Sequence, residues 1–219
     1  MKDVVLFGYG KMGSSIARGW MHQKLNFNFY VVEKKINLRK IAIKDGFRTY
    51  KNFEELDKYK NFKFFDVIFL AVKPQQMEKT LKIFSKFNFK TSVFVSIAAG
   101  LSFSWFRLKV NEKIKIVRAM PNLPASVGYG TTGYCKSENV TKEEENDIFA
   151  LLSAFGKTIY LKNENLIDVV TAISGSGPGY IFYLVEVFSN IGIEQGLSLK
   201  DAKLLASQTL IGSARLIEN

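Results

Sequence analysis

The sequence predicts an α/β protein in which a doubly wound sheet is followed by an all-helical domain. Short runs of continuously apolar residues recur up to about Leu161, which is typical of strands that are covered on both faces. Segments with helical periodicity separate these runs. From Glu164 onward only helical patterns occur, so we place a domain boundary near Asn163, with domains over residues 1–163 and 164–219.

The first half of the chain has the pattern of repeated strand–helix units. Residues 4–7 form a strand that ends in glycines, residues 12–21 carry apolar side chains at helical spacing, and residues 29–32 form a second strand. Longer apolar runs over 66–72 and 92–97 predict further buried strands, with a helical segment around 77–87 between them. Continuous apolarity in these runs indicates helices on both faces of the sheet.

The second half begins with strands and ends with helices. Strands are predicted over 115–120, 128–134 and 157–161, and Thr141 with Glu144 has the form of a capping box that begins a helix towards Phe155. Further helices are expected over 165–173, 178–192 and from 199 towards the end. The last helix has apolar residues with no visible partner in the chain: Leu204, Leu205, Ile211 and Leu216. We expect it to pack on a second subunit, or the natural protein to continue.

The composition is that of a folded globular protein, with 47% hydrophobic and 23% charged residues in 219. The net charge of +11 comes from lysines scattered along the chain, which suits anionic ligands and argues against nucleic-acid binding. No segment has the apolar length of a membrane span, and the N-terminus does not resemble a secretory leader. We therefore expect a cytoplasmic protein without a membrane partner. The single cysteine, Cys135, fits a reducing compartment and indicates neither a disulfide nor a zinc site.

Gly8-Tyr9-Gly10-Lys11-Met12-Gly13 joins the first strand to the first helix and has the pattern of a Rossmann-type dinucleotide site. Its glycines allow a tight turn, a close approach of the backbone to a pyrophosphate, and close packing of helix on strand. The helix N-terminus then binds phosphate through free N–H groups. Glu33 has the spacing of a ribose-binding acid and favours NAD. Lys34 and Lys35 either bind the extra phosphate of NADP or are solvated surface, and the choice stays open.

Two loops at the ends of buried strands are expected to border the nicotinamide and its ribose, because ligands of open α/β sheets bind there. They are Ala71-Val72-Lys73-Pro74-Gln75 and Ser96-Ile97-Ala98-Ala99-Gly100. Lys73 then lies near the reacting centre, or it closes the strand with its ammonium group in water. Ser174-Gly175-Ser176-Gly177-Pro178-Gly179-Tyr180 either offers backbone donors to an anion or to the nicotinamide, or is a flexible interdomain turn.

His22 is the only histidine and falls late in the first predicted helix, so neither a histidine base nor a histidine metal site is expected. A dehydrogenase that acts on an alcohol normally needs a base for the hydroxyl proton. Reduction of a protonated imine needs only hydride delivery and a pocket that positions the cation. The sequence therefore favours C=N chemistry, with no metal.

Over nearly its whole length the chain resembles the pyrroline-5-carboxylate reductases. The motifs are the glycine loop, Ala71-Val72-Lys73-Pro74-Gln75, Ala98-Ala99-Gly100, Arg118-Ala119-Met120-Pro121-Asn122-Leu123-Pro124, Glu164-Asn165-Leu166-Ile167-Asp168, Ser174-Gly175-Ser176-Gly177-Pro178, and a helix with Gly196-Leu197, Ala202, Leu205-Ala206, Gln208-Thr209 and Gly212-Ser213-Ala214. The resemblance implies reduction of 1-pyrroline-5-carboxylate to L-proline with NADPH or NADH, the last step of proline synthesis. It also implies a Rossmann domain followed by a helical dimerisation domain, hence a homodimer or a higher homo-oligomer.

The resemblance and the strand ends together define the expected site. The expected cofactor contacts are Phe7, Gly8, Tyr9, Gly10, Lys11, Met12, Gly13, Glu33, Lys34, Asn52, Ala71, Val72, Lys73, Pro74, Ile97, Ala98 and Ala99. Lys73 and Glu164 are the expected catalytic residues. The expected substrate contacts are Asn122, Glu164, Ser176 and Gly177.

The chain departs from the family at two places. It ends before the serine-, glycine- and threonine-rich segment that holds the substrate carboxylate in relatives, so the helical domain looks truncated. It also has Glu33 where relatives that prefer NADPH tend to carry small polar residues. One alternative is a β-hydroxyacid- or ketol-acid-type oxidoreductase, disfavoured because no lysine–asparagine catalytic helix or acidic metal pair is found. The other is a cofactor-binding fragment without turnover.

Overall fold

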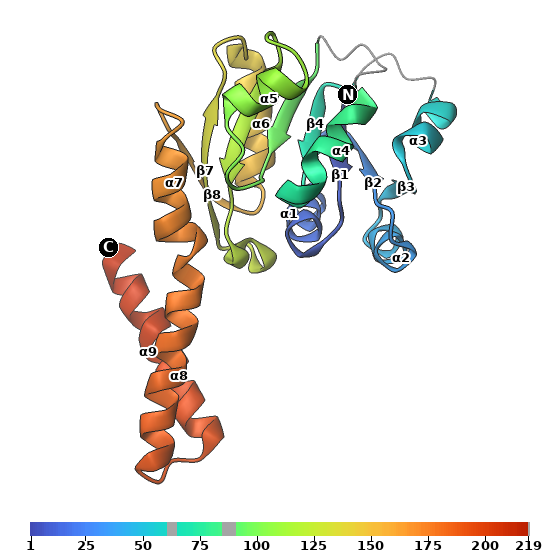
Figure 1. The fold of residues 1–219 in the computed structure, drawn as a ribbon. Coiled ribbons are helices and arrows are strands. Elements are labelled where there is room, and N and C mark those ends of the chain that lie inside the picture. Colours follow the sequence, from blue (N-terminus) through green and yellow to red (C-terminus); the bar gives the residue numbers. More distant parts are fainter. Residues whose placement is uncertain (61–64, 85–90, 219) are drawn as a thin grey trace. The chain divides into compact units, whose positions relative to one another are not determined.

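The computed structural model describes residues 1–60, 65–84 and 91–218. The chain divides into two compact units, Met1–Gly175 and Ser176–Asn219, and each is described by itself (Figure 1). The first unit contains the sheet and the helices that cover it, and the second unit is helical. The boundary expected near Asn163 stays a prediction.

Within the described residues, the first unit is built on one eight-stranded sheet with the order β3-β2-β1-β4-β5-β6-β7-β8. Strands β1 to β6 are parallel, whereas β7 runs antiparallel to β6 and pairs in parallel with β8. The strand order reverses between β1 and β4, and doubly wound sheets bind their ligands at such a switch point. The strands are β1 (Lys2–Phe7), β2 (Phe27–Val32), β3 (Arg48–Tyr50), β4 (Val67–Leu70), β5 (Val93–Ser96), β6 (Lys115–Met120), β7 (Gly130–Lys136) and β8 (Gly156–Tyr160).

Helices cover both faces of this sheet. They are α1 (Lys11–His22), α2 (Ile36–Lys44), α3 (Phe53–Lys60), α4 (Pro74–Phe84), α5 (Phe103–Lys109) and α6 (Lys142–Ser153). In β1, Val4 and Leu6 join the core layer that contains residues of α1, α2 and α6, while Val5 and Phe7 join the layer that contains residues of α3, α4 and α5. Coverage on both faces explains why these strands are continuously apolar.

The chain leaves the sheet through short helical turns. The 3₁₀ turn η1 (Leu123–Val127) follows β6, and α7 (Leu166–Val170) runs into the π-helical turn η2 (Thr171–Gly175). One regular helix was predicted over 165–173, whereas the structure has a short α-helix followed by a π-helical turn. Thr171 and Ser174 donate from their hydroxyl groups to carbonyl oxygens four residues earlier in this segment.

The second unit is a hairpin of α8 (Gly177–Glu194) and α9 (Leu199–Glu218). Small residues let the two helices approach closely: a Cβ on Gly192 would lie 3.2 Å from Cβ of Ala202, and Ala202 and Ala206 are both buried. Among the described residues, none of the helices combines the length and the apolar character that crossing a membrane requires.

The predicted strands are all found, with shifts of a few residues at their ends. The capping box is confirmed, because Thr141 accepts from the N–H of Glu144 and the Glu144 carboxylate accepts from the N–H of Thr141. The helix predicted around 77–87 is α4, and residues 85–87 lie outside the described part. No sequence pattern predicted α2, β3, α3 or α5.

Candidate active site

Three backbone hydrogen bonds bring the ends of neighbouring strands together at the switch point. The N–H of Gly8 donates to the last carbonyl of β2 at 2.9 Å, that of Ala71 to the last carbonyl of β1 at 2.9 Å, and that of Ile97 to the last carbonyl of β4 at 3.3 Å. The loops that leave β1, β4 and β5 therefore begin side by side. The structure thus brings together three loops that were predicted from separate motifs.

The three glycines of the first loop meet different surroundings. Gly8 has a left-handed backbone, with φ of 96°, and an added Cβ would lie 2.6 Å from the carbonyl oxygen of Ala71. A Cβ on Gly13 would overlap the carbonyl oxygen of Gly8. A Cβ on Gly10 would meet nothing within 4 Å. Gly8 and Gly13 are therefore required by the packing of the loop, and Gly10 leaves open space above its backbone.

The N-terminus of α1 is suited to an anion. Gly10 is the N-cap and provides no side-chain acceptor, and the first turn carries no acidic residue. The first N–H groups of a helix have no acceptors within the helix, and their dipoles favour negative charge. These donors lie next to the open space at Gly10, an arrangement that fits the pyrophosphate of a dinucleotide.

Glu33 is attached directly to the glycine loop. Its Oε2 accepts from the N–H of Tyr9 at 2.8 Å, and its Oε1 accepts from the N–H of Lys35 at 2.8 Å. Arg39 donates from Nη1 to the carbonyl oxygens of Glu33 and Lys34, at 2.9 and 2.7 Å, and so shapes the turn after β2. The side chains of Lys34 and Lys35 are exposed. No sequence motif indicated the role of Arg39.

Tyr9 contributes its backbone to the loop surface and its side chain to the core. The ring is buried, its hydroxyl donates to Oδ2 of Asp45 at 2.7 Å, and Nε of Arg18 donates to the same oxygen at 2.9 Å. Burial, together with the Asp45 carboxylate, raises the pKa of Tyr9 well above its usual range. The phenol therefore stays protonated at neutral pH and holds the loop on α2.

The loops after β4 and β5 differ in the exposure of their residues. Lys73 is exposed, immediately before the first residue of α4, and has no ion pair within the described residues. Ala98 is buried and donates from its N–H to Oγ of Ser96 at 3.3 Å, whereas Ala99 is exposed. Lys73 therefore lies beside the switch point with its side chain exposed.

Asn52 and Asn122, which were predicted to contact the cofactor and the substrate, each accept a backbone hydrogen bond. Oδ1 of Asn52 accepts from the N–H of Glu55 at 2.9 Å and so caps α3. Asn122 is buried, and its Oδ1 accepts from the N–H of Thr131 at 2.8 Å. Their expected contacts with the cofactor and the substrate stay predictions.

Glu164 is held by a buried cation. Its Oε1 accepts from Nη1 of Arg118 at 2.7 Å and from the N–H of Phe103 at 2.6 Å. The Arg118 side chain is 7% exposed and that of Glu164 is 25% exposed. The sequence indicated no role for Arg118 beyond its position inside a family motif. The catalytic and substrate-binding roles expected of Glu164 stay predictions.

The chain is similar to known reductases along nearly all of its length. A family model described as "Pyrroline-5-carboxylate reductase dimerisation" matches residues 164–219, and one described as "NADP oxidoreductase coenzyme F420-dependent" matches residues 3–100. The pyrroline-5-carboxylate reductase of Staphylococcus epidermidis is 32% identical, over 98% of this chain and 79% of its own length. This chain belongs to the pyrroline-5-carboxylate reductase family.

Solved structures of pyrroline-5-carboxylate reductases have the same fold. The enzyme of Coxiella burnetii superposes with a TM-score of 0.88 at 28% identity, over 100% of this chain and 80% of its own. That of Plasmodium falciparum, solved with NADP bound, has a TM-score of 0.81 at 28% identity, over 99% of this chain and 79% of its own. The predicted family and fold class are confirmed.

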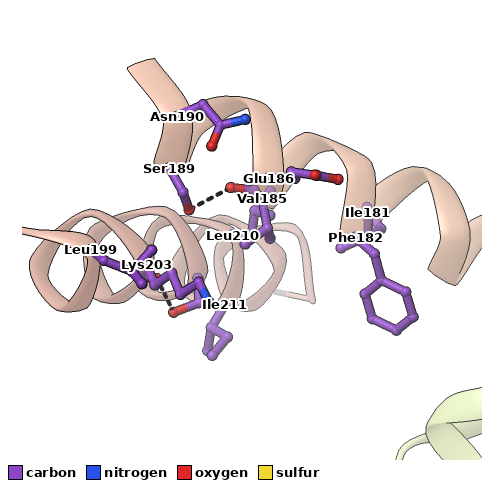
Figure 2. Close-up of a pocket in the computed structure, with 11 residues that line it drawn as sticks. Ile181, Phe182, Val185, Glu186, Ser189, Asn190, Leu199, Lys203, Leu210 and Ile211 are labelled. Carbon is purple, nitrogen blue, oxygen red and sulfur yellow. Dashed lines mark hydrogen bonds between the residues drawn. The ribbon is translucent and has the colours of Figure 1, made fainter. Parts of the chain in front are cut away.

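The reductase dimerisation domain has a wide apolar surface on its helices. A groove of about 810 Å³ lies between α8 and α9. Figure 2 shows Phe182 and Ile211 among the residues that line it. These two side chains are 60% and 55% exposed. The residues of the last helix that were predicted to lack a partner are also exposed: Leu204, Leu205, Ile211 and Leu216. Such a surface is typical of an interface between subunits.

Ser176 and Gly177 begin the second unit, at the start of α8. Their predicted contact with the substrate stays a prediction. Among the described residues, no group of three histidine, cysteine, aspartate or glutamate side chains is arranged to hold a metal ion. His22 is exposed at the end of α1.

Proposed function

We propose that this chain reduces 1-pyrroline-5-carboxylate to L-proline with NADH or NADPH, as a homodimer or a higher homo-oligomer. The observation that carries the proposal is the 32% identity to a pyrroline-5-carboxylate reductase over 98% of the chain. The three adjoining loops at the switch point support it, because they have the shape and the donors that a dinucleotide requires. The cytoplasmic location and the absence of a nucleic-acid partner stay predictions.

In this proposal the cofactor lies across the switch point. The loop with Gly8, Gly10 and Gly13 holds the pyrophosphate, and Glu33 accepts from the adenosine ribose hydroxyls through lone pairs that its two backbone bonds leave free. The loops over residues 71–74 and 97–99 border the nicotinamide. When bound, the reduced nicotinamide supplies a hydride to the carbon of the substrate C=N bond.

Lys73 acts on the substrate side of this arrangement. Its ammonium group is exposed beside the loops, and it attracts and orients the carboxylate of the anionic substrate. Reduction of a protonated imine requires no base to remove a proton, so a chain without a suitably placed histidine is adequate for the reaction. We also expect backbone or amide N–H groups to donate to the substrate, from Asn122, Ser176 and Gly177.

The test is a turnover assay on protein produced from its complete reading frame. With 1-pyrroline-5-carboxylate, it should oxidise NADH or NADPH and form L-proline in equal amount. A panel of β-hydroxyacids and ketol acids with the oxidised cofactors should give no reaction. Turnover of the hydroxyacid panel without turnover of the imine would contradict the proposal.

A further inference from the structure

Within the first unit, Glu164 joins the residues that precede α7 to β6 and α5. One carboxylate oxygen accepts both from the Arg118 guanidinium in β6 and from the N–H of Phe103, the first residue of α5. Breaking a buried ion pair by removing one partner strongly destabilises a protein, so the Glu164–Arg118 pair fixes Glu164 against β6 and the start of α5.

An apolar cluster joins the same segments independently. Ile167 of α7 and Leu161 are buried in it, and Phe103 and Met120 pack against them. Gly175 also approaches this cluster, since an added Cβ would lie 2.9 Å from Cε of Met120. The residues that lead towards α8 therefore pack against the beginning of α5 and the end of β6.

The loop between β5 and α5 is fixed at both of its ends. Ile97 and Ala98 are held at the beginning by bonds to the end of β4 and to Ser96. At the other end, Ser102 accepts from the N–H of Trp105, and Glu164 accepts from the N–H of Phe103. Glu164 thus supplies one of the bonds that anchor the far end of the loop that contains residues 97–99.

We propose that Glu164 is a positioning residue which, through the start of α5, steadies the loop over residues 97–99 and so strengthens nicotinamide binding. The inference rests on the proposed use of a dinucleotide. Glu33 and the glycine loop hold the adenosine and pyrophosphate on the other side of the switch point, whereas the hydrogen bonds of Glu164 go to Arg118 and Phe103. Its effect is therefore confined to one half of the cofactor.

The test compares two ligands on the same variants. NADH and NADPH engage all three loops, whereas ADP engages only the glycine loop and the turn after β2. In Glu164→Gln we expect the dissociation constant of the dinucleotide to rise about tenfold, within the usual range of coupling between sites, while that of ADP stays unchanged. Glu164→Asp retains the charge with a shorter reach, so it should lose less affinity. Calorimetric titration measures both ligands.

Glu144→Gln is a matched control. Glu144 is 22% exposed, accepts from the Lys115 ammonium at the start of β6 at 2.6 Å, and accepts from the N–H of Thr141. Glu144→Gln therefore loses an ion pair and a backbone hydrogen bond similar to those of Glu164, but near the start of β6. This variant should bind ADP and the dinucleotide as tightly as the wild type does. If Glu164→Gln does not fold, Glu164→Asp and Arg118→Lys carry the same comparison.

Each remaining outcome is decisive. Equal loss of ADP and dinucleotide affinity would show a merely structural role and overturn the inference, as would unchanged binding of both ligands. A wild-type protein that binds no dinucleotide would instead refute the proposed function.

Discussion

Replacing Glu33 with glutamine tests how the chain chooses between NADH and NADPH. Both carboxylate oxygens accept backbone N–H groups at 2.8 Å, so the charge is fixed next to the glycine loop. A 2′-phosphate placed 4 Å away would be repelled by about 1 kcal/mol in water and about 4 kcal/mol at an effective dielectric of 20. The wild-type chain should therefore prefer NADH by about fivefold or more. Glu33→Gln should remove most of this preference.

The measurement is the ratio of the dissociation constants of NADH and NADPH, taken by titration of cofactor fluorescence. Glutamine retains one acceptor oxygen, so either Tyr9 or Lys35 loses its partner and the free energy of unfolding should fall by about 1–3 kcal/mol. Lys34→Ala and Lys35→Ala are the controls, and each should raise the preference for NADH slightly. A wild-type preference for NADPH that Glu33→Gln leaves unchanged would refute the reasoning.

Four further predictions rest on packing and burial. Gly13→Ala should lower the melting temperature and abolish dinucleotide binding, because its Cβ would overlap the Gly8 carbonyl. Gly10→Ala should weaken dinucleotide binding and leave the melting temperature unchanged, because its Cβ would meet nothing within 4 Å. Calorimetry of both variants separates these effects. Ile211→Glu should convert the oligomer to monomer in sedimentation velocity, since this exposed apolar side chain needs a partner surface, and Lys200→Glu should leave the oligomer intact. Burial raises the pKa of the Cys135 thiol to about 11, so it should resist alkylation at neutral pH until the chain unfolds; rapid alkylation of the folded protein would contradict the burial. Because this pKa lies above the value of 9.0 for a free thiol, the stability that depends on the neutral thiol should be lost as the pH rises from 9.0 to about 11.

The glycine loop could be predicted because its shape depends on the backbone conformation of neighbouring residues. Gly8 and Gly13 are needed where a strand turns directly into a helix, and that requirement falls within six consecutive residues, Gly8 to Gly13. Strands buried on both faces are likewise evident as continuous apolar runs. The antiparallel direction of β7 was not predicted, because the pairing of β7 with β6 depends on a connection whose path has no sequence signature.

The contacts of Glu164 could not be predicted, since they join residues that are distant in sequence. Arg118 and Phe103 lie 46 and 61 positions away from it. The short helices α2, α3 and α5 were missed because few of their residues are buried: α2 buries Ala42 and α5 buries Phe106. The change from α7 to η2 has no sequence signature, because the hydroxyl bonds of Thr171 and Ser174 also occur in the regular helices α8 and α9.

The most direct test of the central claim is the reduction of 1-pyrroline-5-carboxylate by protein from the complete reading frame. The consumption of reduced nicotinamide is followed by absorbance, and the product is identified by chiral chromatography. The account predicts that NADH or NADPH is consumed in equal amount to the L-proline formed. Binding of the cofactor without any L-proline formed with either cofactor would contradict it.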